Sequence, residues 1–389
     1  MKKVEKMKAQ SRNTFAIASI LILMMILSSC SSLDTAAPKD DQSKGKTSDT
    51  IRIGAVLALT GAASIHGQNE REGLELAKKE INQAGGIAGK PVQIIYEDDQ
   101  TDSAKSVTAI KKLIELDNIK LIIGGTWDYL ANAEIPVIDQ DKAVLLSPSA
   151  LPDTITVKSD YFFAMHSPVA LHQSAIEKWV DISHPTKVMA IVVDNPWGYA
   201  HLKALRAASI AKNFKIIDER MLPSFEGNDI ATEVTKVKAS DADGLFVAMN
   251  FNDNAMLAKK RIEQSIKIPI LAGEDFLTAL TAGKMDPSQA EGVSTVMFQS
   301  DPTGFPARFE KEYNKPADIY SDTAYDSLYA FKAAIENADS QDPDKVIQAL
   351  HEISYDGASG RIFFGDKNYP ENKLSVLGTI RDGKWVKDE

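Results

Sequence analysis

The sequence predicts an α/β fold of two doubly wound, Rossmann-like lobes. Stretches typical of strands alternate with stretches typical of helices from residue 51 onward, and this alternation indicates parallel sheets with helices on both faces. The βαβ units are too many for one compact sheet, so we expect two domains of ordinary size. Residues 147–168 interrupt the alternation with three prolines, and we interpret this segment as a crossing between the lobes.

The first half of the pattern runs from residue 51 to residue 146. Its opening strand, residues 51–59, is apolar almost throughout, which is typical of a strand buried on both faces. Apolar residues recur at helical spacing through residues 67–84, and Gly85-Gly86 ends this helix as a C-cap. The same reasoning predicts a strand at 91–96, a helix at 103–116, a strand at 120–123, a helix at 132–139 and a strand at 143–146.

The alternation resumes after the crossing. Residues 188–193 form a continuous apolar run that predicts another buried strand, and residues 318–337 have a strong helical pattern. Strand character returns near the C-terminus, which indicates more than one crossing between the lobes. The other predicted helices are at 199–212, 230–239, 254–265 and 344–350. A further strand begins at 215–217, and the remaining predicted strands are at 244–249, 268–271, 361–364 and 374–380.

The N-terminus has the layout of a secretory signal peptide at residues 1–29. A basic segment precedes 13 uncharged, mostly apolar residues, whereas a transmembrane helix needs about 20. The Leu-Ser-Ser-Cys sequence that ends at Cys30 resembles the bacterial lipobox, in which the cysteine is lipidated and becomes the first mature residue. The alternative is an uncleaved signal anchor with an incidental cysteine. Residues 30–50 are polar, and we interpret them as a lipid-anchored flexible tether.

Composition and charge limit the partners of the chain. It has 389 residues, one cysteine and a net charge of −10, and removal of residues 1–29, which carry +4, leaves −14. This charge argues against nucleic acid or anionic lipid as partners, so we expect the membrane to be contacted through the lipid on Cys30. A lone cysteine forms no intramolecular disulfide, and the fold must therefore rely on its hydrophobic core.

The loops that follow the predicted strands are the candidate ligand site, because ligands of open parallel sheets bind at the carboxyl ends of the strands. These loops are rich in Trp, Asp, Glu, Asn and small residues, as small-molecule sites are. Trp127, Trp197 and Phe276 fit pocket lining and core packing equally well, and Glu274 is the acid that we place most readily in a cleft. The loops are 60–67, 124–129, 147–153, 194–199, 250–254 and 274–276.

Motifs typical of enzymes and cofactor sites are missing. The sequence has no Gly-x-Ser-x-Gly motif, and its six histidines lack the close spacing of a metal motif. Residues 85–90 faintly resemble a phosphate loop, but they follow a helix and precede a strand, so a helix stop fits better. Asp98-Asp99 could bind a cation, although paired acids at a strand end more often are solvated or cap the next helix. We therefore expect no enzymatic activity, no cofactor and no metal ion.

A family resemblance rests on four segments: IRIGAVLALTGAASIHGQ, NQAGGIAGKPVQIIYEDDQTD, LIIGG and LLSPSA. They resemble the type I periplasmic binding proteins, and the leucine/isoleucine/valine-binding proteins of ABC transporters in particular. The resemblance implies two lobes joined by a hinge of three crossings, with the ligand cleft between them. It implies an N-terminal lobe of residues 51–167 plus 298–350 and a C-terminal lobe of residues 168–297 plus 351–389.

The resemblance also implies which residues line the cleft. In this family a serine after the third strand holds the ligand α-carboxylate, and Asp128 stands at that position here. The acid that pairs with the ligand ammonium is matched by Glu274. The residues at the family's ligand positions are His66, Trp127, Asp128, Ser149, Trp197, Asn250, Phe251, Glu274 and Tyr320.

The acid at position 128 bears on the class of ligand. An ionised Asp128 about 4 Å from a ligand carboxylate would repel it by about 4 kcal/mol at an effective dielectric constant of 20, or about a thousandfold in affinity. Two acids facing one cleft with Trp127 and Trp197 as walls would suit an amine, amide or other cationic ligand. A conventional amino acid is an equally good candidate for the ligand if the Asp128 side chain turns away from the cleft or is protonated.

The function that the resemblance implies is that of an extracytoplasmic substrate-binding lipoprotein of an ABC importer. We expect a monomer, lipid-anchored to a bacterial membrane in the periplasm or at the cell surface. It would capture a small amino-acid-like or amine/amide solute by lobe closure and deliver it to the permease and ATPase subunits. The alternative is a ligand-sensing lipoprotein on the same fold that signals to a membrane receptor.

Overall fold

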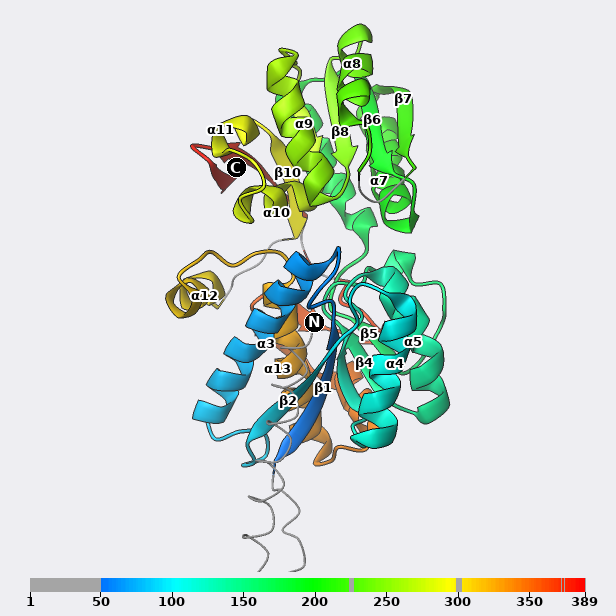
Figure 1. Cartoon of the computed structure of the whole chain (residues 1–389), viewed down its shortest axis with the longest axis vertical. Coiled ribbons are helices and arrows are strands. Elements are labelled where there is room, and N and C mark those ends of the chain that lie inside the picture. Colours follow the sequence, from blue (N-terminus) through cyan, green and yellow to red (C-terminus); the bar gives the residue numbers. More distant parts are fainter. Residues whose placement is uncertain (1–49, 224–226, 299–302, 372, 374, 389) are drawn as a thin grey trace, which may run out of the picture. The chain divides into compact units, whose positions relative to one another are not determined.

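The computed structural model describes residues 50–223, 227–298, 303–371, 373 and 375–388, and these belong to one compact unit. The predicted signal peptide, Cys30 and nearly all of the predicted tether lie outside the described residues. Within the described part of the chain, none of the helices combines the length and the apolar character needed to cross a membrane. Two sheets, each covered by helices, form two lobes (Figure 1).

The first lobe is built on a parallel sheet of five strands in the order β2-β1-β3-β4-β5. β1 is in register with β2, from Ile51 opposite Val92 to Leu57 opposite Asp98. This order reverses direction at β1, so the loops after β1 and β3 face each other at the carboxyl edge of the sheet. The strands are β1 (Ile51–Leu57), β2 (Val92–Asp98), β3 (Leu121–Gly124), β4 (Val144–Ser147) and β5 (Phe162–Ala164).

Helices cover both faces of this sheet because its strands are apolar on both sides. Ile53 and Ala55 of β1 pack in one core cluster with α3 and α13, whereas Val56 packs in a second cluster with α4 and α5. The helices of this lobe are α3 (Ser64–Gln83), α4 (Ser103–Lys111), which continues as a π-helical turn at Lys112–Leu116, α5 (Asp128–Asp141), α12 (Phe305–Tyr313), α13 (Ser321–Ala338) and α14 (Pro343–Glu352).

The second lobe contains a mixed sheet of seven strands in the order β14-β13-β10-β9-β8-β6-β7. Five strands are parallel, and the two C-terminal strands complete the sheet as an antiparallel edge. The strands are β6 (Lys187–Val193), β7 (Lys215–Leu222), β8 (Gly244–Ala248), β9 (Ile270–Ala272), β10 (Ser294–Phe298), β13 (Ser375–Arg381) and β14 (Lys384–Lys387).

The helices of the second lobe also divide between the two faces of their sheet. Trp179 of α6 and Leu205 of α7 lie in one core cluster, and Val234 of α8, Leu257 of α9 and Phe276 of α10 lie in another. Phe276 is fully buried, so it is a core residue. The helices are α6 (Gln173–Ser183), α7 (Pro196–Lys212), α8 (Ile230–Ala239), α9 (Phe251–Glu263), α10 (Asp275–Thr281) and α11 (Pro287–Ala290).

The last crossing falls later in the chain than the boundary predicted at residue 351. The hairpin of β11 (Ser354–Gly357) and β12 (Gly360–Phe363) contributes Ile362 to the same core cluster as α3 and α13. Asp326 of α13 explains this, because its carboxylate accepts hydrogen bonds from the backbone N–H groups of Ala358 and Ser359. The hairpin therefore packs with the first lobe, and only β13 and β14 join the second.

Candidate functional site

Nine residues from both lobes line a cavity of about 50 Å³, here called the cleft cavity. All lie in loops or at helix starts that follow the carboxyl ends of strands, except Tyr320, which precedes α13. The cavity has room for water molecules, and a larger solute needs the lobes or the side chains to move apart. The lining residues are Trp127, Asp128, Tyr129, Ser149, Leu151, Asn195, Trp197, Asp275 and Tyr320.

Five of the residues predicted to line the site are brought together in this cavity. Trp127, Asp128 and Ser149 come from the first lobe, Trp197 comes from the second, and Tyr320 comes from the segment before α13. The other four predicted residues, His66, Asn250, Phe251 and Glu274, are buried but do not line the cleft cavity.

Trp127 is held in place by hydrogen-bond partners from two other segments. Its backbone N–H donates to Ser149 Oγ at 3.1 Å, and its indole Nε1–H donates to His66 Nδ1 at 2.7 Å. Its φ is +74°, and Tyr320 has a φ of +72°. Bulky residues seldom adopt this left-handed region, and a residue held there marks a site whose surroundings over-determine its conformation.

His66 lies behind Trp127, at the start of α3, and is fully buried. Because Nδ1 accepts from Trp127, the proton of the neutral ring is on Nε2. Nε2 lies 3.7 Å from Asp275 Oδ1 and has no hydrogen-bond partner among the described residues. Burial lowers the pKa of His66 to about 3, which keeps the ring neutral. His66 thus brings the wall of the first lobe close to an acid of the second lobe without a hydrogen bond between them.

Two carboxyl groups face the cleft cavity from opposite lobes. Asp128 is the first residue of α5 and Asp275 is the first residue of α10, where a carboxylate is favourable next to the helix dipole. Burial raises the pKa of Asp128, opposed by hydrogen bonds from Thr154 and the Tyr129 backbone. Burial and the neighbouring charge of Glu274 raise the pKa of Asp275 well above its usual value. No Lys or Arg is among the described residues that line this cavity.

Glu274 is engaged by two histidines. Its Oε1 lies 2.5 Å from His172 Nε2, and its Oε2 lies 3.1 Å from His201 Nε2. Burial opposes ionisation of Glu274, but the two imidazoles more than offset it, so its pKa lies well below the usual value. With both oxygens occupied, Glu274 is not the acid that faces the cleft cavity. Its neighbour Asp275 takes that position.

Asn250 and Phe251 stand at the start of α9. Asn250 is fully buried, and its Oδ1 accepts from the backbone N–H groups of Asn252 and Asp253, as an N-cap residue does. Phe251 is buried and packs against His66 in an edge-to-face contact, with ring centroids 5.6 Å apart. Both residues therefore support the site from behind.

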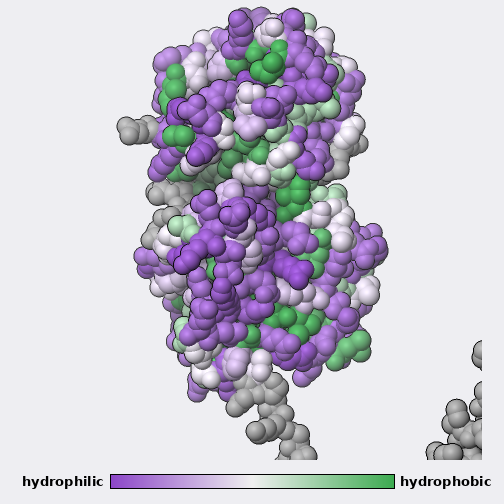
Figure 2. Space-filling view, turned by 60° about the vertical axis from the view of Figure 1, so that its left-hand side comes forward, coloured by the Kyte–Doolittle hydropathy of each residue, from purple (hydrophilic) through white to green (hydrophobic). Residues whose placement is uncertain are grey.

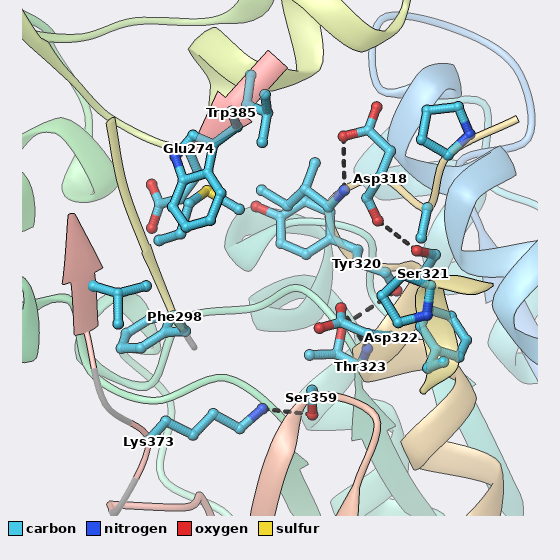
Figure 3. A pocket seen from close by; sticks show the side chains of 18 of the residues that line it. Glu274, Phe298, Asp318, Tyr320, Ser321, Asp322, Thr323, Ser359, Lys373 and Trp385 are labelled. Carbon is cyan, nitrogen blue, oxygen red and sulfur yellow. Dashed lines mark hydrogen bonds between the residues drawn. The ribbon is translucent and has the colours of Figure 1, made fainter. Parts of the chain in front are cut away.

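A second, larger cavity of about 360 Å³ lies on the other side of Tyr320 and Glu274. Tyr320 also lines the cleft cavity, so its ring is a wall of both. In Figure 3 the side chains of Glu274 and Phe298 lie across the cavity from Asp322, and Lys373 Nζ donates to Ser359 Oγ at 2.7 Å.

Sequence reasoning missed Tyr129, Asn195 and Asp275 as individual lining residues. All three stand in loops that it had selected, after β3, β6 and β9. The signal that locates them is the end of each strand, since the first residues beyond the carboxyl edge point into the cleft.

Comparisons with known proteins agree with this architecture. A family model described as "Periplasmic binding protein" matches residues 50–384. A "Leu/Ile/Val-binding protein homolog 3" of Brucella melitensis is 24% identical over 311 residues, which cover 78% of this chain and 83% of the relative. A "Leucine-, isoleucine-, valine-, threonine-, and alanine-binding protein" of Pseudomonas aeruginosa is 22% identical, covering 83% of this chain and 88% of the relative.

Solved structures show the same fold. The branched-chain amino acid transporter substrate-binding protein LivJ of Streptococcus pneumoniae, in complex with isoleucine, has a TM-score of 0.75 at 20% identity, covering 87% of this chain and 100% of that one. An ABC transporter solute-binding protein of Rhodopseudomonas palustris, in complex with 3,4-dihydroxybenzoic acid, has a TM-score of 0.78 at 20% identity, covering 87% and 96%. These neighbours are solute-binding proteins, not enzymes. This chain therefore belongs to the periplasmic binding protein family.

Proposed function

We propose that this chain is the extracytoplasmic substrate-binding lipoprotein of an ABC importer. It captures a small amine or amino-acid-like solute between its lobes and delivers it to a permease. The observation that carries the proposal is the cleft cavity, to which both lobes contribute aromatic side chains and one carboxyl group each. Relatives over most of the chain are named for binding branched-chain amino acids, which supports a small organic solute.

The two carboxyl groups that line the cavity favour a cationic group on that solute, whose positive charge would lower their raised pKa values and favour their ionised forms. Asp128 and Asp275 approach from opposite lobes, and no Lys or Arg is among the described lining residues to hold a carboxylate. Trp127 and Trp197 offer π-faces that attract a cation. An ammonium between the two acids would pair with both lobes at once, so binding it would favour the closed form.

The proposal is tested by calorimetric titration of the purified protein with a panel of alkylamines, diamines and branched-chain amino acids. We expect an amine-bearing ligand to bind, and Asp128→Asn and Asp275→Asn each to weaken that binding by about 100-fold, because each removes a charge-assisted contact. Asp366→Asn is the matched control, since Asp366 is exposed. Tight leucine binding that is unchanged in Asp128→Asn would remove the charge argument.

We further propose that Cys30 carries the lipid and that residues 30–50 form the tether. The lipobox-like sequence before Cys30 and the mature charge of −14 support anchoring by acyl chains instead of a basic surface. Hydrophilic residues cover most of the face in Figure 2, and hydrophobic ones form small separate groups, which supports a monomer. Detergent-phase partitioning tests the anchor: Cys30→Ser should move the protein into the aqueous phase, and unchanged partitioning would refute the lipid.

A further inference from the structure

We propose that His172, His201 and Glu274 form a binding site for a divalent transition metal ion, with zinc as the expected occupant. Each residue offers one ligand atom, and these atoms all lie within 4.8 Å of one another. All three side chains are buried. The site is separate from the cleft cavity, so the inference does not depend on the identity of the transported solute.

Three elements of the second lobe hold the cluster. His172 ends the short 3₁₀ helix Val169–His172 that follows the first crossing, His201 lies on α7, and Glu274 immediately precedes α10. The two imidazoles approach with the same atom, Nε2, one toward each carboxylate oxygen. Such convergence of two imidazole nitrogens and one carboxylate is the donor set of known three-ligand zinc sites.

The Nδ1 atoms of the two rings point away from the cluster, and their hydrogen-bond partners show which ring nitrogen carries the hydrogen. His201 Nδ1 lies 3.0 Å from the carbonyl oxygen of Trp197, which can only accept, so Nδ1 carries the hydrogen. In the neutral ring the Nε2 lone pair then faces a carboxylate oxygen at 3.1 Å. A proton on Nε2 or a metal ion must lie between two such atoms at this distance, and a zinc titration distinguishes these two cases.

His172 has the matching arrangement. Its Nδ1 lies 2.7 Å from Ser375 Oγ, a hydroxyl that can accept the Nδ1 hydrogen. Histidines that bind metal ions usually donate their other N–H to a carbonyl, carboxylate or similar acceptor, which fixes the tautomer and the ring orientation. Both imidazoles of this cluster therefore already have the outer partners that metal ligands have.

The surroundings leave room for the rest of a coordination sphere. Zinc binds imidazole nitrogen and carboxylate oxygen at about 2.0–2.2 Å, so the hydrogen-bonded atoms need to separate only slightly to admit the ion. Glu274 lines the larger cavity, which gives a water molecule access to a fourth position. His166 lines the same cavity, is 93% buried, and its Nδ1 has no hydrogen-bond partner among the described residues.

A metal ion at this site would stabilise the packing of the segments next to the crossings against the loop that lines the ligand cleft. His172 follows the first crossing, and its hydrogen-bond partner Ser375 begins the strand after the last crossing. The imidazole ring of His172 also contacts Phe298 at the end of β10. Glu274 is joined directly to Asp275, which faces the cleft cavity. The site would thus stabilise the hinge end of the second lobe.

The experiment is a zinc titration of the purified, chelator-treated protein in a Cys30→Ser background, which removes the only thiol. We expect one zinc ion per chain, a higher melting temperature in zinc, and cobalt absorption bands typical of tetrahedral nitrogen and oxygen ligation. His201→Gln and Glu274→Gln should each weaken zinc binding about 100-fold or more. The control His184→Gln changes an exposed histidine and should have no effect.

A rescue variant distinguishes a metal site from an internal ion pair of the same three residues. His201→Cys keeps a zinc ligand but removes the imidazole, so it should bind zinc where His201→Gln does not. Far-UV circular dichroism checks that each variant is folded, and the cobalt spectrum of the parent protein does not depend on any variant folding. Absence of stoichiometric zinc binding by the parent protein, or equal binding by His201→Gln, would overturn the proposal and leave the cluster as an ion pair.

Discussion

Aromatic residues with left-handed backbone conformations mark the cleft cavity at the scale of single residues. Trp127 and Tyr320 precede α5 and α13, and both line this cavity. Such a conformation costs on the order of 1–3 kcal/mol, and the hydrogen bonds of Trp127 to Ser149 and His66 offset part of that cost. The sequence identified the tryptophan as a candidate, but nothing local to it encodes a positive φ.

A buried acid behind Trp127 should make stability depend on pH. Glu70 of α3 is fully buried, and its Oε2 accepts from Thr126 Oγ1 at 2.5 Å. Burial raises its pKa to about 8; hydrogen bonds from Ser149 and Thr126 oppose the rise, and the charge of Asp99 adds to it. Between about pH 4.5 and 8 the folded state keeps a proton that the unfolded state has lost, so the free energy of unfolding falls as pH rises.

Glu70→Gln should therefore flatten this pH dependence. Its effect should reach a few kcal/mol by pH 9, on the scale of 1.36 kcal/mol per pKa unit, and urea unfolding at pH 6, 7.5 and 9 measures it. Glu134, also buried, remains in both proteins; because the charge of Glu70 contributes to its raised pKa, the comparison measures Glu70 together with this coupling. Glu115→Gln changes an exposed acid of the same lobe and serves as the control. Equal slopes for Glu70→Gln and the parent protein would contradict the assignment.

At the scale of elements, the sequence predicted the strands and their loops well because each signal is local. The apolar run at residues 188–193 became β6 (Lys187–Val193), and the cleft cavity is lined mainly from loops selected in advance. The expectation that Asp98-Asp99 caps the next helix is wrong, because the N-cap of α4 is Asp102. Asp98 instead accepts hydrogen bonds from the backbone N–H groups of Thr60, in the loop after β1, and of Gln100, in the turn before α4.

The parts that the sequence could not predict depend on distant partners. Glu274 is 102 residues from His172 and 73 residues from His201, so no spacing motif reveals their cluster. The family resemblance placed residues 351–389, and with them the hairpin of β11 and β12, in the second lobe. What fixes it in the first lobe is the buried carboxylate of Asp326.

That contact gives a prediction about the hairpin. Asp326 is fully buried and accepts from the Ala358 and Ser359 backbones at 2.8 and 2.7 Å and from Ser359 Oγ at 2.6 Å. Asp326→Ala leaves buried N–H groups unpaired, at about 1–3 kcal/mol each, so we expect a loss of about 3 kcal/mol in urea unfolding. Asp356→Asn breaks only an exposed ion pair with Arg361 on the same hairpin and should cost less than about 1 kcal/mol. Similar losses in both variants would contradict this role of Asp326.

At the scale of the whole molecule, three crossings connect lobes that enclose two cavities, the cleft cavity of about 50 Å³ and the larger cavity of about 360 Å³. The chain passes between the sheets after β5, after β10 and after the β11–β12 hairpin. We propose that the moving bodies are residues 51–167 with 303–364 and residues 168–298 with 375–388. The cleft cavity is the smaller of the two, so we expect its walls to move apart before a solute enters between Asp128 and Asp275.

Ligand binding should therefore make the molecule more compact. Asp275 connects the lobes, since it lines the cleft cavity from the second lobe and lies 3.7 Å from His66 of the first. Small-angle X-ray scattering of the parent protein should show a smaller radius of gyration once a bound solute favours the closed form. Asp275→Asn should reduce this contraction at matched ligand saturation, because the solute then lacks its contact in the second lobe, whereas Asp366→Asn should contract as the parent does. A radius of gyration that no bound solute changes would exclude lobe closure as the capture mechanism.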